Sequence, residues 1–282
     1  MKKVGSVVIS IILCLGLLAA CGSGNSGTSG SSGGASSDAA AGDSAYSTIK
    51  EGTLMVGIEI GYPPMEYFDE DGKTPIGFDV EMATALAEDM GLELELIDTA
   101  WDGIFAGVDT DKYDVVISSV SWTEDRNDKM LLSKTYIANA PVLVVPNESE
   151  IADIQDLAGK SVAVQMETTA DYLVQEYVTG GLDTEVKQFD KVINAFDELK
   201  AGRTDAVCTD SVVAAFYLGD DAANYKTVWE AEEKEPICMA FKKGNDGIKT
   251  AVEASLDNIK ASGKLAEIAN KYFGTDSVIN VD

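Results

Sequence analysis

The 282-residue sequence contains 21 lysine and arginine residues, 48 aspartate and glutamate residues and no histidine, which gives a formal net charge of −27. A surface this acidic repels phosphate backbones, so we expect no nucleic-acid partner. The lack of histidine excludes His-based catalytic triads and His zinc sites. We therefore predict that the protein is not an enzyme and has no catalytic residue, metal or cofactor.

The first twenty residues have the pattern of an export signal peptide. Lys2 and Lys3 begin it, residues 4–18 are apolar, and Leu-Ala-Ala then leads to Cys21. The apolar stretch is short for a membrane helix. Leu-Ala-Ala-Cys resembles the bacterial lipobox, which implies cleavage before Cys21 and lipidation there, with palmitate among the acyl groups, as a membrane anchor. A plain signal peptide with an incidental cysteine is the alternative.

Residues 22–44 are almost wholly Gly, Ser, Ala, Asn, Thr and Asp, which cannot bury enough surface to fold. With Cys21 they form a predicted anchor and flexible linker over residues 21–46, with a reach of about 25–30 Å. The folded part that follows contains Cys208 and Cys238. We expect two buried, unlinked thiols, and a disulfide between them is the alternative.

Predicted strands and helices alternate from residue 53 onward. Leu54, Val56 and Ile58 have the alternation of a strand, and two prolines at 63 and 64 end its pairing near Gly61. Asp79 is predicted to cap a helix that Gly91 ends. Further strands are predicted at 93–98, 114–119, 161–165, 185–189 and 205–210, and further helices at 101–108, 123–129, 169–178, 192–201 and from 211.

This alternation predicts an α/β fold with mostly parallel sheets covered by helices on both faces. Two apolar extended segments, 140–146 and 236–241, interrupt the alternation, each at the boundary of a block. We predict that they are two strands that cross between two lobes. The first lobe would hold residues 47–136 and 237–282, and the second would hold residues 137–236. One continuous sheet is the alternative.

Several motifs occur in the order in which one protein family carries them. They are YPPME at 62–66, GFDVEM at 77–82, SSVSWTEDR at 118–126, AGRTDA at 201–206 followed by Asp210, and KYFG at 271–274. Each motif alone is a weak signal, but the ordered set over about residues 52–275 is specific. Together they resemble the polar amino-acid-binding proteins of ABC importers.

The resemblance implies a two-lobed periplasmic-binding-protein-like fold. It also implies an extracytoplasmic receptor that closes around a polar or basic amino acid and delivers it to an ABC transporter permease. We expect a monomer, lipid-anchored at the extracellular side of the bacterial cytoplasmic membrane. The alternative is an enzyme on the same scaffold, similar to cyclohexadienyl dehydratase, in which carboxylates would serve as acid and base.

The family's pattern also assigns roles to the two charged residues that would hold the ligand backbone. A guanidinium binds the carboxylate of a free amino acid, and a fixed carboxylate binds its ammonium group. Arg126 matches the family's carboxylate-binding arginine, and Asp210 matches its ammonium ligand. The alternatives are a helical ion pair of Arg126 with Asp125 or Asp128, and a helix-capping role for Asp210.

Four further polar positions match this pattern. Ser119 and Ser121 offer a carbonyl and a hydroxyl to the same two ligand groups. Thr168 and Thr169 lie at a helix start, where free amides attract the ligand carboxylate. Relatives commonly have glycine at the preceding position, where this sequence has Glu167, and this departure puts the local backbone contact in doubt. Ala170 likewise replaces a common polar residue.

Three residues would face the ligand side chain. Tyr62 and Trp101 match the aromatic pair that encloses it, and for Tyr62 a role as a cap over the core is the alternative. Glu59 matches an acidic position that contacts ligand side chains. A buried, uncompensated Glu59 carboxylate favours lysine, arginine or ornithine, followed by histidine or glutamine. Hydration of Glu59, or a lysine partner, is the alternative.

Overall fold

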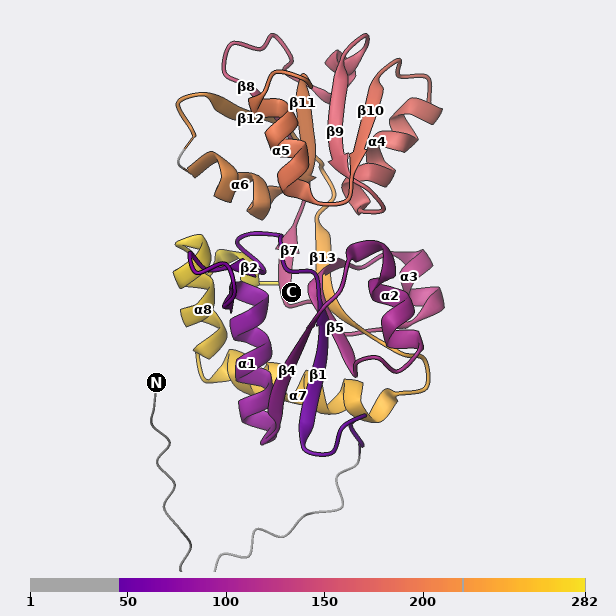
Figure 1. Ribbon diagram of the computed structural model, residues 1–282, viewed down its shortest axis with the longest axis vertical. Coiled ribbons are helices and arrows are strands. Elements are labelled where there is room, and N and C mark those ends of the chain that lie inside the picture. The colour runs from indigo at the N-terminus through magenta and orange to yellow at the C-terminus, as the bar shows by residue number, and fades with distance from the viewer. Residues whose placement is uncertain (1–45, 220, 282) are drawn as a thin grey trace, which may run out of the picture. The chain divides into compact units, whose positions relative to one another are not determined.

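The computed structural model describes residues 46–219 and 221–281. The predicted signal peptide, the predicted lipidation site Cys21 and almost all of the predicted linker lie outside these described residues. The first of two larger sheets has the strand order β4–β1–β5–β13–β6, with β7 also paired to β13 (Figure 1). Its strands are β1 (Thr53–Ile58), β4 (Glu93–Asp98), β5 (Val115–Ser121), β6 (Leu131–Leu132), β7 (Ile137–Asn139) and β13 (Glu235–Phe241).

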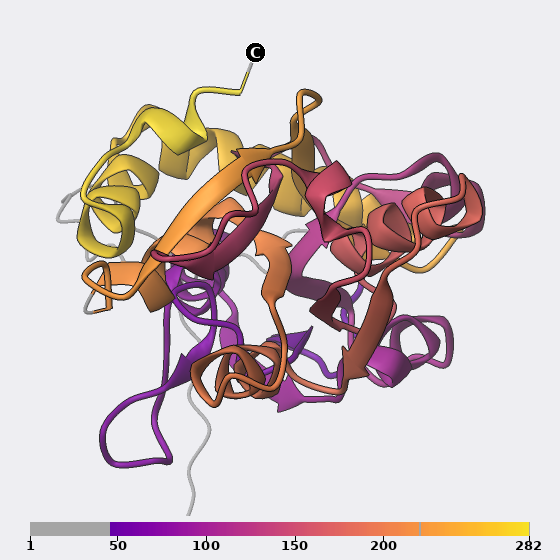
Figure 2. The same cartoon turned by 90° about the horizontal axis from the view of Figure 1, so that it is seen from above.

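Helices cover both faces of the first sheet because its strands alternate between two apolar clusters. Met239 and Phe241 of β13 pack in one cluster with α1 (Phe78–Met90), α7 (Asp246–Ala261) and α8 (Lys264–Phe273). Cys238 and Ala240 pack in the other with α2 (Trp101–Asp109), which α3 (Glu124–Lys129) follows along the chain. Figures 1 and 2 show the yellow α8 on the opposite side from the purple α2.

The second sheet has the order β10–β9–β11–β8–β12. Helices α4 and α5 contact its parallel strands, and α6 contacts β8, β11 and β12. The elements are β8 (Pro141–Pro146), β9 (Ser161–Gln165), α4 (Thr169–Thr179), β10 (Glu185–Phe189), α5 (Val192–Lys200), β11 (Ala206–Asp210), α6 (Ser211–Gly219) and β12 (Tyr225–Glu230). Shorter elements are the hairpin β2 (Tyr67–Phe68) and β3 (Pro75–Ile76), and the 3-10 turns η1 (Ile154–Leu157) and η2 (Ser277–Ile279).

Both sheets are mixed, whereas the sequence predicted mostly parallel sheets. Strands β1, β4 and β5 pair in parallel, as do β9, β10 and β11. By contrast β8 and β13 pair antiparallel with their neighbours on both sides. The reason is connectivity. Parallel neighbours need a crossover of a dozen or more residues, whereas β8 and β13 follow short links from the other sheet.

The chain passes between the sheets at Ala140, between β7 and β8, and again between β12 and β13. The predicted crossing segments therefore lie at these passages, but each of their strands belongs to one sheet. β7 pairs with β13 in the first sheet, although the predicted second lobe begins at residue 137. The boundaries of the two lobes remain a prediction.

The start of α1 differs from the prediction that Asp79 is its N-cap. The N-cap is Gly77, at φ 132°, and a Cβ there would come within 2.2 Å of the Met65 carbonyl oxygen. Asp79 lies inside the first turn, fully buried, and accepts hydrogen bonds from other elements. Gly91 ends the helix in a left-handed conformation, as predicted.

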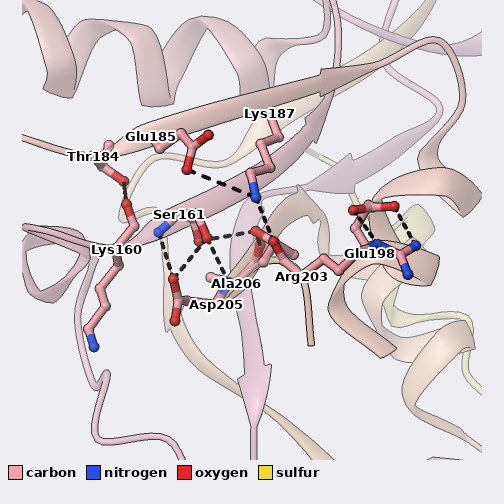
Figure 3. Close-up of polar contacts among 10 residues, drawn as sticks. Lys160, Ser161, Thr184, Glu185, Lys187, Glu198, Arg203, Asp205 and Ala206 are labelled. Atoms are coloured by element: carbon pink, nitrogen blue, oxygen red, sulfur yellow. Dashed lines mark hydrogen bonds and ion pairs between the residues drawn. The ribbon is translucent and has the colours of Figure 1, made fainter. Parts of the chain in front are cut away.

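Polar contacts tie together the amino-terminal starts of β9, β10 and β11 (Figure 3). The amide and hydroxyl of Ser161 both donate to Asp205 Oδ2 at 2.8 Å, and Lys187 Nζ donates to the Arg203 carbonyl. Arg203 in turn pairs with Glu198. These contacts lie at one end of the parallel strands, so the carboxyl ends are left for ligands.

Cys208 and Cys238 are free and buried, in different sheets, as expected. None of the described helices is long and apolar enough to cross a membrane.

Candidate ligand-binding site

One cavity of about 320 Å³ brings together every ligand-binding residue predicted from the sequence. The cavity is lined by Glu59, Tyr62, Trp101, Ser119, Ser121, Arg126, Thr168, Thr169 and Asp210, together with Glu66, Ser118 and Gln165, to which the sequence assigned no role. These residues meet because most of them lie at or just beyond the carboxyl ends of β1, β5, β9 and β11.

Arg126 presents a buried guanidinium without an acidic partner. It is 7% exposed, its guanidinium carbon lies 5.3 Å from the Trp101 ring and 5.1 Å from the Phe105 ring, and Nη1 donates to the Ser121 carbonyl at 2.8 Å. Among the described residues, no ion pair involves Arg126, because Asp125 pairs with Lys129 instead. Burial lowers the pKa of Arg126. The guanidinium therefore keeps donors for an anion.

Asp210 contributes a carboxylate from the second sheet, at the end of β11. The Tyr62 hydroxyl donates to Asp210 Oδ2 at 2.7 Å, and both side chains are buried. Burial, followed by the nearby charge of Glu235, raises the pKa of Asp210 to about 7. Tyr62 also packs in the apolar cluster of the core, so it serves both the core and the cavity.

Only one oxygen of the Glu59 carboxylate accepts a hydrogen bond from the described residues. Gln165 Nε2 donates to Glu59 Oε2 at 2.8 Å, while Oε1 is buried without a partner among the described residues. Burial raises the pKa of Glu59 to about 7, against the opposing effects of the Gln165 hydrogen bond and the Lys191 charge. Lys191 itself donates to the Ile60 carbonyl at 2.9 Å. A lysine therefore lies near Glu59, but it is bound to backbone and forms no ion pair with that carboxylate.

Glu235, at the start of β13, joins the hydroxyls of Ser121 and Thr169. Its Oε2 accepts from Ser121 at 2.9 Å and from Thr169 at 2.8 Å. Because a hydroxyl has only one proton, both side chains then offer the cavity lone pairs rather than donors. The Thr168 hydroxyl is also engaged, donating to the Gln165 carbonyl and accepting from the Asp171 amide as the N-cap of α4. Among the described residues, donors available to an anion include Arg126, the amides at the start of α4, and the Ser119 hydroxyl, which is buried without a hydrogen-bond partner.

The departure at Glu167 preserves the backbone turn. Glu167 adopts φ 62°, a left-handed conformation that glycine adopts most easily. Its amide donates to Asp171 Oδ2 at 2.9 Å, and its carbonyl accepts from Trp101 Nε1 at 3.1 Å. The contact between Trp101 and the second sheet is therefore present. Ala170 packs in the apolar cluster of that sheet, which leaves no polar side chain at this position.

The three residues to which no role was assigned lie within recognisable sequence signals. Glu66 ends the YPPME motif, Ser118 begins the SSVS motif, and Gln165 ends a predicted strand. The position of Gln165 at a strand end could have indicated the site. No sequence signal pointed to Glu235, because its partners Ser121 and Thr169 are distant in the chain.

The chain matches the family described as bacterial extracellular solute-binding proteins, family 3, over residues 54–275. The chain belongs to this family. It is 33% identical over 239 residues to the L-cystine-binding protein TcyJ of Escherichia coli strain K12, covering 84% of this chain and 88% of the relative. It is 30% identical over 280 residues to the L-cystine-binding protein TcyA of Bacillus subtilis strain 168, covering 98% and 99%.

Among solved structures, an ancestral arginine-binding protein bound to arginine superposes with a TM-score of 0.75 at 36% identity, covering 79% of this chain and 99% of that one. An ancestral amino acid-binding protein described as a precursor of cyclohexadienyl dehydratase gives 0.73 at 32% identity, covering 79% and 96%. These similarities confirm the predicted periplasmic-binding-protein-like fold.

Proposed function

We propose that the protein is the amino-acid receptor of an ABC importer, which closes around its ligand and delivers it to the permease. The observation that carries the proposal is that Arg126 and Asp210, from the two sheets, line one cavity. Arg126 lies in α3, directly after β5 of the first sheet, whereas Asp210 ends β11 of the second. An amino acid bound to both would tie the sheets together.

The chemistry of the two residues matches the ends of a free amino acid. The Arg126 guanidinium has no acidic partner among the described residues. A ligand carboxylate would neutralise its charge and accept hydrogen bonds from its planar set of donors. Asp210 Oδ2 already accepts from the Tyr62 hydroxyl, so the other oxygen remains for an ammonium group. Lone pairs of Ser121 and Thr169 add acceptors for that ammonium.

The charge balance supports a ligand with a cationic side chain. The carboxyl groups of Glu59 and Asp210 line the cavity with a single guanidinium. Glu59 Oε1 has no donor among the described residues, and a cationic group would supply one. We propose lysine, arginine or ornithine. Cystine, named in two relatives, comes next, because its second ammonium suits Glu59 but its second carboxylate adds negative charge.

The test is binding of the twenty amino acids, ornithine and cystine to protein that has been unfolded and refolded to remove any retained ligand. Thermal shifts rank the ligands and calorimetry measures their affinities. We expect a basic amino acid to bind most tightly, and Glu59→Gln to weaken it far more than a neutral ligand. Tight binding of aspartate or glutamate would refute the charge argument. A failure of every amino acid to bind would refute the receptor itself.

The same samples address the enzyme alternative. A receptor returns its ligand unchanged, so chromatography after a long incubation should recover the added amino acid quantitatively. Consumption of a cyclohexadienyl substrate by the refolded protein would instead support the enzyme. We expect none, because the homologues named above are binding proteins.

We further propose that Cys21 carries a lipid and that the protein acts as a monomer on the extracellular side of the membrane. The family description as extracellular proteins supports the location. Membrane fractionation of cells that express the wild type and Cys21→Ser tests the anchor. We expect the variant to leave the membrane fraction, and equal membrane retention would refute lipidation.

A further inference from the structure

Two buried carboxyl groups lie side by side behind the Ser118–Ser119 end of the cavity. Glu66 is 1% exposed and Asp79 is fully buried. Glu66 lines the cavity, whereas Asp79 belongs to the first turn of α1. The surrounding hydrogen bonds use one oxygen of each carboxyl and leave the other without a donor among the described residues.

The hydrogen bonds of Glu66 have a defined direction. The Glu59 amide donates to Ser118 Oγ at 3.0 Å, so the Ser118 hydroxyl is the acceptor in that bond. Ser118 is then free to donate its own proton to Glu66 Oε1, at 2.7 Å. Oε1 is therefore an acceptor. Oε2 is buried and has no donor among the described residues.

The hydrogen bonds of Asp79 are also defined. Asp79 Oδ2 accepts from the Ser119 amide at 2.8 Å and from the Tyr136 hydroxyl at 3.0 Å. Oδ1 is buried and likewise lacks a donor in the described part of the chain. The partners of the two carboxyl groups, Ser118 and Ser119, are adjacent in β5, and each carboxyl group acts on the pKa of the other as a hydrogen-bond partner. One proton between Glu66 Oε2 and Asp79 Oδ1 would satisfy both unpaired oxygens.

We propose that Glu66 and Asp79 share this one proton, carried on Glu66 and donated to Asp79, and that the pair holds Ser118 and Ser119 in position at the cavity. The proton belongs on Glu66 because Asp79 accepts two hydrogen bonds, which stabilise its anion, whereas Glu66 accepts one. Two ionised carboxylates in contact inside a protein repel each other strongly, so the pair retains a proton at neutral pH.

The charges around the pair favour the same arrangement. In the described part of the chain, Glu59, Tyr62 and Tyr136 interact electrostatically with the pair, and all three are acids. Burial, together with the charge of Asp79, raises the pKa of Glu66 well above its usual range. Ser119 adopts φ 47°, and the hydrogen bond from its amide to Asp79 helps to hold this conformation. The consequence for the ligand rests on the proposed function, but the shared proton does not.

Glu66→Gln is the decisive variant, because its amide donates to Asp79 as the protonated acid does, while its carbonyl accepts from Ser118. The stability of this variant against pH and its infrared spectrum test the shared proton without recourse to ligand binding.

Stability against pH distinguishes this role from a purely structural one. The folded wild type keeps a proton that the unfolded chain releases above the usual glutamate pKa, so wild-type stability falls as the pH rises toward the raised folded pKa. The amide of the Glu66→Gln variant has no such proton to release. The melting temperature of the variant minus that of wild type should therefore increase by about 10 °C from about pH 5 to pH 8, because wild type retains the proton throughout this interval. A constant difference would overturn the proposal.

Glu81→Gln, on the same helix as Asp79, is the matched control. Burial acts to raise the pKa of Glu81, but hydrogen bonds from Lys271 and Tyr272 lower it overall. Glu81 is therefore ionised in both folded and unfolded chains between about pH 5 and pH 8, and the control should show no increase over this interval.

Infrared spectroscopy of the ligand-free protein reports the proton directly. At about pH 8.5, above the raised values of Glu59 and Asp210, wild type should show the carbonyl stretch of a protonated carboxylic acid. Glu66→Gln should lose this band, and Glu81→Gln should keep it. Absence of the band in wild type would overturn the proposal even if the variant failed to fold. A protein with the band but no amino-acid affinity would refute the proposed function alone.

Discussion

Arg126→Met separates ligand binding from folding, because it removes a buried guanidinium and keeps an apolar stem against Trp101 and Phe105. Two charge-assisted hydrogen bonds to a ligand carboxylate are worth about 1.5–3 kcal/mol each. Loss of both should weaken binding by at least about 3 kcal/mol, which is more than a hundredfold in Kd. The loss should be the same for every amino acid, since all share the α-carboxylate.

The same substitution should not lower the stability of the ligand-free protein. Among the described residues Arg126 has no acidic ion-pair partner, and burial lowers its pKa, so its charge is only partly compensated, by the Ser121 carbonyl and by more distant acids, until a ligand arrives. Its stacking on the two rings contributes about 1–2 kcal/mol, which the methionine stem replaces in part. The melting temperature of free Arg126→Met should therefore equal or exceed that of wild type.

The assay compares four refolded proteins by calorimetry and thermal denaturation with and without ligand. Arg126→Lys keeps the charge but not the planar pair of donors, so its affinity should lie between wild type and Arg126→Met. Arg203→Met is the control, because Arg203 pairs with Glu198 on the surface away from the cavity (Figure 3). Binding by Arg126→Met within tenfold of wild type would refute the assignment of Arg126 to the ligand carboxylate.

Three further predictions follow from the same site. Because burial raises the pKa of Asp210 to about 7 and an ammonium ligand needs its anion, affinity should weaken as the pH falls below about 7. Titration calorimetry should find weaker binding with a smaller pH dependence in Asp210→Asn, in which Glu59, with a pKa also raised to about 7, still titrates. Glu167→Gly should raise the free energy of unfolding by up to about 1 kcal/mol in denaturant melts, since φ 62° is strained for glutamate, and Glu167→Ala should not. Ligand should reduce the radius of gyration of wild type in solution scattering but not that of Arg126→Met, and an unchanged wild-type profile at saturation would contradict closure.

Local sequence patterns predicted most of the regular structure. Strands at 93–98, 161–165 and 185–189 have the predicted bounds, because their alternation and their flanking turns are encoded within a few residues. The prediction failed where a partner came from elsewhere in the chain. Asp79 resembles a helix cap by its local context, but it is buried inside α1, bonded to Ser119 and Tyr136. β8 and β13 became antiparallel through connections that strand patterns do not encode.

The sequence alone indicated the residues of the site, because the motifs of the family carry them in order and strand ends place them at one edge. Only the tertiary structure decided which of these side chains donate hydrogen bonds to a ligand and which accept them. Glu235 meets the hydroxyls of Ser121 and Thr169 only when β13 passes between the two sheets. Glu66 and Asp79 meet the adjacent residues Ser118 and Ser119 only when the chain around α1 packs against β5. Hydrogen-bond direction and burial depend on all neighbours at once, and no stretch of sequence contains them.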